Sequence, residues 1–134
     1  MVSIIRNISF DCRDVELVGR FWAAVTGYVD DPSNPNEPGD PEWVLLSPSG
    51  DGPALLFLAV PEDKAVKNRV HLDLQPDDSR EAELERLLAL GASLVADHRR
   101  ADGAGWVVLA DPEGNEFCLE RSAQQRLATM ERTA

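Results

Sequence analysis

Residues 70–74, Val70-His71-Leu72-Asp73-Leu74, decide the fold. Apolar and polar residues alternate through this stretch, which predicts a β-strand with one buried face. A second alternating stretch ends at Cys12, and a shift of 64 residues places its Phe10 on Leu74. The same element therefore occurs twice, which indicates an internal repeat.

The elements that follow each strand repeat in the same order. Asp14 suits the N-cap of a first helix, and a shift of 64 residues places Gly27, its expected stop, on Gly91. The same shift superimposes two turns, Ser47-Pro48-Ser49-Gly50 and Asp111-Pro112-Glu113-Gly114. Beyond this turn the first half carries three extra residues, Asp51-Gly52-Pro53, so the shift falls to 61 and Phe57 is placed on Cys118.

The repeat predicts an α+β fold of two tandem β-α-β-β-β units in a single domain, residues 1–134. Unit one is expected at about 3–60, a linker at 61–68, unit two at about 69–121 and a tail at 122–134. The expected helices are 14–26 and 79–90, and the expected strands are 3–12, 42–46, 54–60, 69–75, 93–97, 105–110 and 116–121. Ser122 and Gln125 form a capping box, which predicts a short C-terminal helix with Leu127 and Met130 as its apolar anchors.

The composition excludes several classes of partner. The 134 residues include 24 acidic and 13 Lys or Arg residues, a net charge of −11, which argues against nucleic acid and anionic membranes. The longest apolar run, Ala54–Val60, is far too short to span a bilayer. Two cysteines, Cys12 and Cys118, cannot form a disulfide framework, and we see no signal peptide, so a cytoplasmic location is expected.

Three motifs in this order resemble the vicinal oxygen chelate superfamily, which contains glyoxalase I, extradiol dioxygenases, fosfomycin-resistance enzymes and bleomycin-resistance proteins. They are Phe10-Asp11-Cys12-Arg13-Asp14 leading into Phe21-Trp22-Ala23-Ala24-Val25-Thr26-Gly27-Tyr28, then Val70–Leu74, then Asp111-Pro112-Glu113-Gly114-Asn115-Glu116-Phe117. The helix motif Phe21-Trp22 and the stretch Lys67–Leu74 resemble a glyoxalase-like subgroup that is common in high-GC bacteria. The resemblance implies that the two sheets form one curved cup, which holds the site, and that the protein is a homodimer.

Metal-dependent members of this superfamily take ligands from one position on each of four strands. The resemblance places these positions on Asn7, Phe57, His71 and Cys118, and His71 alone matches the family's ligand types. A divalent site needs about three good protein donors. We therefore expect no cofactor and no family-type metal site; a divalent metal on His71, Cys118 and Glu116 remains the alternative.

Strand parity selects the side chains that face the cup. His71 and Asp73 share one face, where His71 is either a general base or ligand anchor oriented by Asp73, or a histidine hydrogen-bonded into the sheet. The other residues expected to bind ligand from this face are Asn7, Ser9, Asp11, Phe57, Glu116, Cys118 and Glu120. Trp43 and Trp106 lie near equivalent positions of the two units, and each is either core packing or a stacking surface at the rim.

Two functions follow from these observations. The first is a metal-independent protein of the bleomycin-resistance type, which sequesters a small molecule in an acidic, partly aromatic cup. The second is a lyase, isomerase or dioxygenase that uses His71 as a base or as a metal ligand. Lys64, Lys67 and Arg69 offer an anion site in the linker, but we interpret them as a solvated linker.

Overall fold

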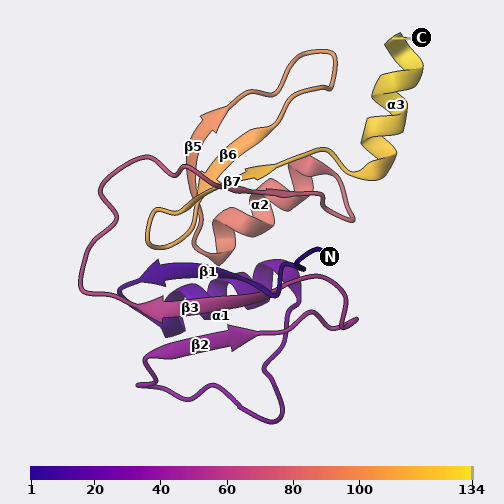
Figure 1. Ribbon diagram of the computed structural model, residues 1–134. Coiled ribbons are helices and arrows are strands. Elements are labelled where there is room, and N and C mark those ends of the chain that lie inside the picture. Colours follow the sequence, from indigo (N-terminus) through magenta and orange to yellow (C-terminus); the bar gives the residue numbers. More distant parts are fainter. Residues whose placement is uncertain (134) are drawn as a thin grey trace. The chain divides into compact units, whose positions relative to one another are not determined.

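The computed structural model describes residues 1–133, and the side chains of residues 1–129. The chain divides into two compact units, Met1–Lys64 and Ala65–Ala134 (Figure 1). Each unit carries a mixed β-sheet with a helix against one face, so the predicted α+β class and the order of elements are confirmed. The predicted anchor Met130 has its side chain outside the described residues.

Unit one contains β1 (Asn7–Cys12), α1 (Val15–Thr26), β2 (Glu42–Leu45) and β3 (Ala54–Ala59). The sheet order is β1-β3-β2, with β1 parallel and β2 antiparallel to β3. The Asp14 carboxylate accepts a hydrogen bond from the Leu17 N–H at 3.1 Å, and Gly27 ends the helix in the left-handed region at φ 75°. Asp14 and Gly27 thus set the two ends of the helix, as the sequence predicted.

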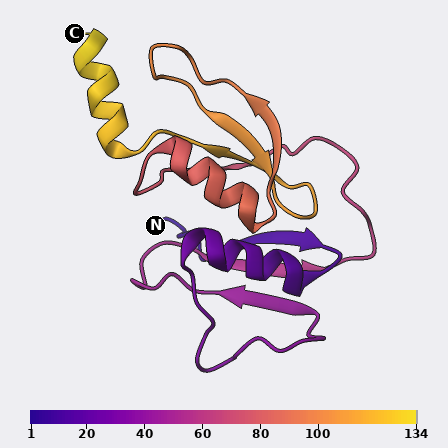
Figure 2. The same cartoon turned by 180° about the vertical axis from the view of Figure 1, so that it is seen from behind.

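In unit one, α1 lies against one face of the sheet (Figure 2). The core between the two is an aromatic stack. The Phe10 ring lies between Trp22 and Phe57, with ring centroids 5.5 Å and 5.2 Å away. Trp43 pairs with Phe57 across β2 and β3 and packs directly on Gly19 of α1, where a Cβ atom would overlap its indole. Phe10, Phe57 and Trp43 therefore all face the helix.

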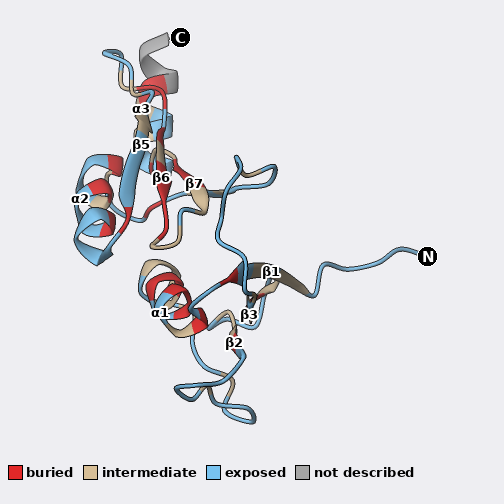
Figure 3. Cartoon of the chain, turned by 90° about the vertical axis from the view of Figure 1, so that its left-hand side faces the viewer, coloured by how far each residue is buried: buried red, intermediate tan, exposed pale blue. Residues whose placement is uncertain are grey.

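Unit two repeats this arrangement with β4 (Leu72–Leu74), α2 (Arg80–Leu90), β5 (Ser93–Asp97), β6 (Val107–Ala110) and β7 (Glu116–Leu119). The sheet order is β4-β7-β6-β5, and β4 runs parallel to β7. Ser79 caps α2 by accepting the Ala82 N–H at 3.1 Å. The buried residues gather in β6, β7 and one side of α2 (Figure 3), and the fully buried ones are Leu87, Val107, Leu109, Phe117 and Leu119.

The predicted C-terminal helix is present as α3 (Ala123–Thr133), and its start is tied to α2. The Ser122 hydroxyl accepts the Gln125 N–H and the Gln125 side chain accepts the Ser122 N–H, which completes the predicted capping box. The same Gln125 oxygen accepts the N–H of Arg80, and its amide donates to Glu81. Leu127, the other predicted anchor, is 61% exposed and does not hold the helix.

Two expected strands are shorter in the structure. The alternation at 3–12 continues into paired strand only from Asn7, and the strand expected at 69–75 pairs only over Leu72–Leu74. β1 begins opposite Ala54, the first residue of β3, and β4 ends opposite Leu119, the last residue of β7. Alternation alone does not show where the hydrogen-bonding partner stops.

The sequence repeat was misplaced by one residue beyond the first turn. In unit two Asp73 lies opposite Cys118, whereas in unit one the corresponding Ser9 lies opposite Leu56. The shift is therefore 62, not 61, and the residue that corresponds to Cys118 is Leu56 rather than Phe57. Because side chains alternate along a strand, this single step moves Phe57 from the expected cup face to the helix face.

Candidate functional site

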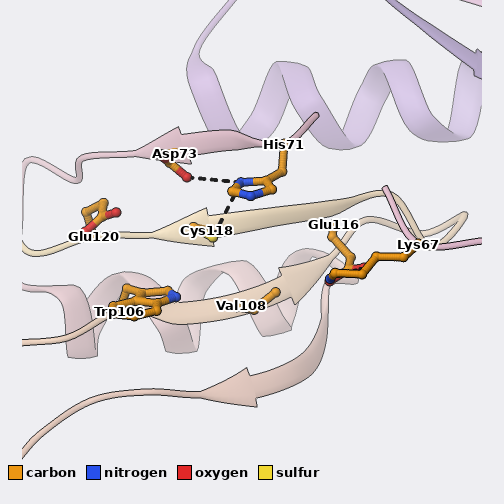
Figure 4. Close-up of a pocket in the computed structure, with 8 residues that line it drawn as sticks. All are labelled: Lys67, His71, Asp73, Trp106, Val108, Glu116, Cys118 and Glu120. Carbon is orange, nitrogen blue, oxygen red and sulfur yellow. Dashed lines mark hydrogen bonds and ion pairs between the residues drawn. The ribbon is translucent and has the colours of Figure 1, made fainter. Parts of the chain in front are cut away.

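A cavity of about 370 Å³ lies on the face of the unit-two sheet that is opposite α2 (Figure 4). The lining residues come from three strands and the segment before β4. They are Lys67, His71, Asp73, Trp106, Val108, Glu116, Cys118 and Glu120.

The strand register explains why these side chains meet. Asp73 lies opposite Cys118, and Cys118 lies opposite Val108, so one row of side chains crosses β4, β7 and β6. Glu116 and Glu120 have the same parity as Cys118 and extend the row along β7 in both directions. Leu72, Phe117 and Leu109 form the row on the other face of the sheet, in contact with the core.

His71, Asp73 and Cys118 form a cluster in the middle of the cavity. The Nδ1 atom of His71 lies 3.2 Å from Oδ1 of Asp73 and 3.7 Å from Sγ of Cys118. With the proton on Nδ1, the ring donates to the Asp73 carboxylate and presents its Nε2 lone pair. The predicted pairing of His71 with Asp73 is thus present in the structure.

The Cys118 side chain is a neutral thiol at physiological pH. Burial raises the pKa of this thiol to about 11, and the negative charges of Asp73, Glu120 and Glu116 act in the same direction. Since the thiolate is the nucleophile and the metal ligand, this environment suppresses both roles. Cys118 therefore supplies a small polarizable surface to the cavity.

This raised pKa predicts a loss of stability at alkaline pH. Between pH 9 and 11 the unfolded chain loses the Cys118 proton, at its ordinary pKa of 9.0, while the folded protein keeps it. The free energy of unfolding that this thiol contributes is therefore constant below pH 9 and is lost between pH 9 and 11. Urea unfolding across this range should show a steeper decline for the wild type than for Cys118→Ala. All other groups are common to both proteins, so parallel slopes would contradict the assignment.

The two ends of the cavity differ in chemistry. Trp106 precedes β6 and Glu120 follows β7, and the antiparallel register places both at the same end (Figure 4). At the other end the Lys67 ammonium lies 3.1 Å from both carboxylate oxygens of Glu116. Trp106 is 38% exposed, and its ring lies beside that of His98, with ring centroids 4.9 Å apart.

A family model for glyoxalase-like domains matches residues 7–120. The chain belongs to the glyoxalase-like domain family. This places it in the vicinal oxygen chelate superfamily, as the sequence motifs predicted. A comparison with curated protein sequences gives no match.

Solved structures of glyoxalase-like proteins share the fold. A mutant of the genomically encoded fosfomycin resistance protein FosX from Listeria monocytogenes, complexed with Mn(II) and 1S,2S-dihydroxypropylphosphonic acid, matches with a TM-score of 0.66, 19% identity and 100% coverage of both chains. FosX from Mesorhizobium loti has a TM-score of 0.66 and 19% identity over 95% of this chain and 99% of that chain. A glyoxalase/bleomycin resistance protein/dioxygenase family enzyme from Burkholderia phytofirmans has a TM-score of 0.62 and 20% identity, covering 84% and 94%.

The donors that this glyoxalase-like chain offers fit the superfamily's four-strand metal site poorly. In unit one, Leu56 occupies one ligand position and has no donor atom, and the Asn7 amide donates to Ser9 at 3.0 Å. In unit two, His71, Asp73 and Cys118 each place a potential ligand atom within 4.8 Å of the others. The sequence offered His71, Cys118 and Glu116 as the alternative set of metal ligands. In the structure Glu116 is paired with Lys67, and Asp73 stands in the trio instead of Glu116.

The structure separates the predicted site residues of this glyoxalase-like chain into three groups. Those that line the cavity are His71, Asp73, Trp106, Glu116, Cys118 and Glu120. Asn7, Ser9 and Asp11 lie on the face of the unit-one sheet that is opposite α1. Phe57, expected in the cup, is instead 0% exposed and packs toward α1. Trp43, for which core packing was one of the two alternatives, is 4% exposed and packs on the same helix.

Two residues that line the cavity were missed. Val108 could have been found from strand parity, because the register predicts a neighbour for Cys118 on β6. Lys67 was interpreted as part of a solvated linker, and no local pattern joins it to Glu116, which is far away in the sequence.

Among the described helices, none is long and apolar enough to cross a bilayer.

Proposed function

We propose that this chain is a metal-independent small-molecule-binding protein of the bleomycin-resistance type, whose unit-two cavity takes up a cationic ligand with a flat apolar part. The observation that carries the proposal is Trp106 beside the Glu120 carboxylate at one end of the cavity. An aromatic face next to a carboxylate attracts a cation through both the ring quadrupole and direct charge pairing. The proposed host is a bacterium.

The charge of the cavity supports a cationic ligand. Three carboxylates line it, from Asp73, Glu116 and Glu120, against the single ammonium of Lys67. The net charge of −11 adds a long-range field of the same sign. An anionic ligand would meet this field and three acidic side chains.

The donor chemistry supports metal independence. A resident metal ion requires deprotonated ligands, and the raised pKa of the Cys118 thiol opposes this. The aliphatic Leu56 removes a further ligand position of the superfamily. A cavity without a metal can still fix an amine through carboxylates alone.

Glu120→Gln tests the proposal, because Glu120 and Trp106 form the position proposed for the cation. A charge-assisted hydrogen bond in a partly buried site contributes about 1.5–3 kcal/mol, so affinity for a cationic ligand should fall about tenfold or more. A thermal-shift screen with bleomycin and other cationic natural products identifies ligands, and calorimetry then measures their affinity. Added salt should weaken the wild type more than the variant.

Asp77→Asn is the matched control for this experiment. It removes the same charge from an exposed position of unit two that does not line the cavity. Equal affinities in the wild type and in both variants, with equal salt dependence, would contradict a cationic ligand and attribute the acidic excess to solubility.

An enzyme that uses His71 is the second candidate. It is favoured by the contacts of His71 with Asp73 and Cys118, and by the trio of ligand atoms within 4.8 Å. The similar FosX from Listeria monocytogenes is complexed with Mn(II). When bound, a divalent metal would supply Lewis-acid chemistry here, and a lyase, isomerase or dioxygenase reaction is then the proposed class. Near-stoichiometric zinc, nickel or iron in native protein, lost in His71→Ala, would favour this candidate.

We further propose a cytoplasmic homodimer. Cys12 and Cys118 are both thiols rather than members of a disulfide, which suits a reducing compartment. Within the two sheets, the edge strands are β1 and β2 in unit one and β4 and β5 in unit two, and such edges are commonly covered by pairing. A monomer of 14.7 kDa by light scattering at micromolar concentration would contradict the dimer.

A further inference from the structure

At one end of the cavity, the Glu116 carboxylate is already paired with a positive charge of the protein, the Lys67 ammonium. The Lys67 Nζ atom lies 3.1 Å from both Glu116 carboxylate oxygens. The Lys67 side chain is 77% exposed, while that of Glu116 is only 15% exposed. The ammonium thus approaches from solvent and covers a carboxylate that is otherwise held inside the cavity.

A hydrogen bond to the residue after Lys67 holds this segment of the chain close to Glu116. The Asn68 side-chain oxygen accepts the N–H of Glu116 at 3.1 Å, which fixes the segment before β4 beside the start of β7. The backbone of Lys67 therefore lies close to Glu116, within reach of the lysine side chain. Arg69, two residues further along the chain, is exposed and does not line the cavity.

The Glu120 carboxylate, at the other end of the cavity, differs from Glu116 in its pairing. Among the described residues, the Glu120 side chain has no hydrogen-bonded or ion-paired partner, and it lies at the Trp106 end. Asp73 is engaged by His71 in the middle (Figure 4). The cavity therefore presents one open position for a cation, at Glu120, and a second position, at Glu116, that is already filled.

We propose that Lys67 is a specificity-determining residue that restricts the cavity to ligands with a single positive charge. The inference rests on the proposed function, because it concerns how many charges the cationic ligand carries. A monocation binds at Trp106 and Glu120 without disturbing Lys67. A dication must displace the Lys67 ammonium from Glu116 or leave its second charge close to that ammonium, and both alternatives weaken binding.

Two matched probes separate these cases. Benzylamine carries one ammonium on an aromatic ring, and p-xylylenediamine carries a second ammonium at the opposite end of the same ring. Calorimetry or ligand-detected NMR gives the affinity of each probe for the wild type, Lys67→Ala and Arg69→Ala. Both variants remove one positive charge from the same segment, so long-range attraction changes similarly in the two.

The ratio of diamine affinity to monoamine affinity is the diagnostic quantity. The ratio should rise about fivefold in Lys67→Ala, which corresponds to the largest free energy usually measured for an exposed ion pair. In Arg69→Ala it should stay near the wild-type ratio. The rise depends on the released carboxylate, so the double variant Lys67→Ala/Glu116→Gln should return to the wild-type ratio.

Each outcome bears on a separate claim. An unchanged ratio in Lys67→Ala, with benzylamine still bound, would overturn the role of Lys67 and leave the proposed function standing. An equal rise in Arg69→Ala would also overturn it, since general charge would then explain the effect. A wild type that binds neither probe nor any other cation, even after Lys67→Ala, would overturn the proposed function itself.

Discussion

Gly105→Ala is expected to lower the free energy of unfolding by about 3 kcal/mol or more. Gly105 has a φ of 91°, in the left-handed region, and a Cβ atom there would overlap the carbonyl oxygen of His98. The obstacle is backbone, which cannot rotate away as a flexible side chain can. The hairpin between β5 and β6 would have to open, and urea unfolding followed by circular dichroism would measure the loss.

Gly39→Ala is the matched control for this substitution. Gly39 has the same φ of 91°, but no atom lies within 4 Å of the position that a Cβ would take. It should therefore cost only the backbone penalty of a left-handed alanine, about 1–2 kcal/mol. Equal losses in the two variants would show that the close approach at His98 has no energetic weight.

Trp106→Ala should weaken the binding of a cationic aromatic ligand about tenfold or more. Loss of the ring removes a cation–π contact and the stacking surface at the Glu120 end, which together are worth on the order of 1–3 kcal/mol. Stability should change little, because the indole is 38% exposed and stands outside the main core. Calorimetry with the ligand identified by the thermal-shift screen gives the affinity.

Trp106→Phe separates ring stacking from other effects at this position. The smaller aromatic ring keeps a π-face, so it should recover a large part of the affinity that the alanine variant loses. An alanine variant that binds as tightly as the wild type would show that Trp106 is only a packing partner of His98.

The order of elements could be predicted from the sequence because it rests on short-range signals. Alternation, the Asp14 cap and the stops at Gly27 and Gly91 are set by neighbouring residues, and all three have the expected conformation. The same parity argument correctly placed His71, Asp73 and Cys118 on one face. Parity needs only the position of each residue within its own strand.

The faces of the two tryptophans could not be predicted, because they depend on the register between strands. The loop before β3 takes up two residues more than its counterpart, where three were expected, and this count decides which face Phe57 occupies. Trp43 lies opposite Phe57 and shares its face. Side chains alternate between the two faces of a sheet, so a register shift of one residue moves every side chain of the strand to the other face. Trp43 is consequently core, while Trp106, one step off the repeat, lines the cavity.

The parallel pairing of β4 with β7 sets the order in which unit two is completed during synthesis. The first strand of the unit hydrogen-bonds to its last, Leu72 opposite Phe117, so the sheet cannot close until β7 has left the ribosome. The row Asp73-Cys118-Val108 forms in the same event. A nascent chain that stalls before residue 116 thus carries every strand of the β1-β3-β2 sheet but lacks the side chains of β7 that line the cavity, so a ligand of the proposed kind would stabilise only chains that extend past Glu120.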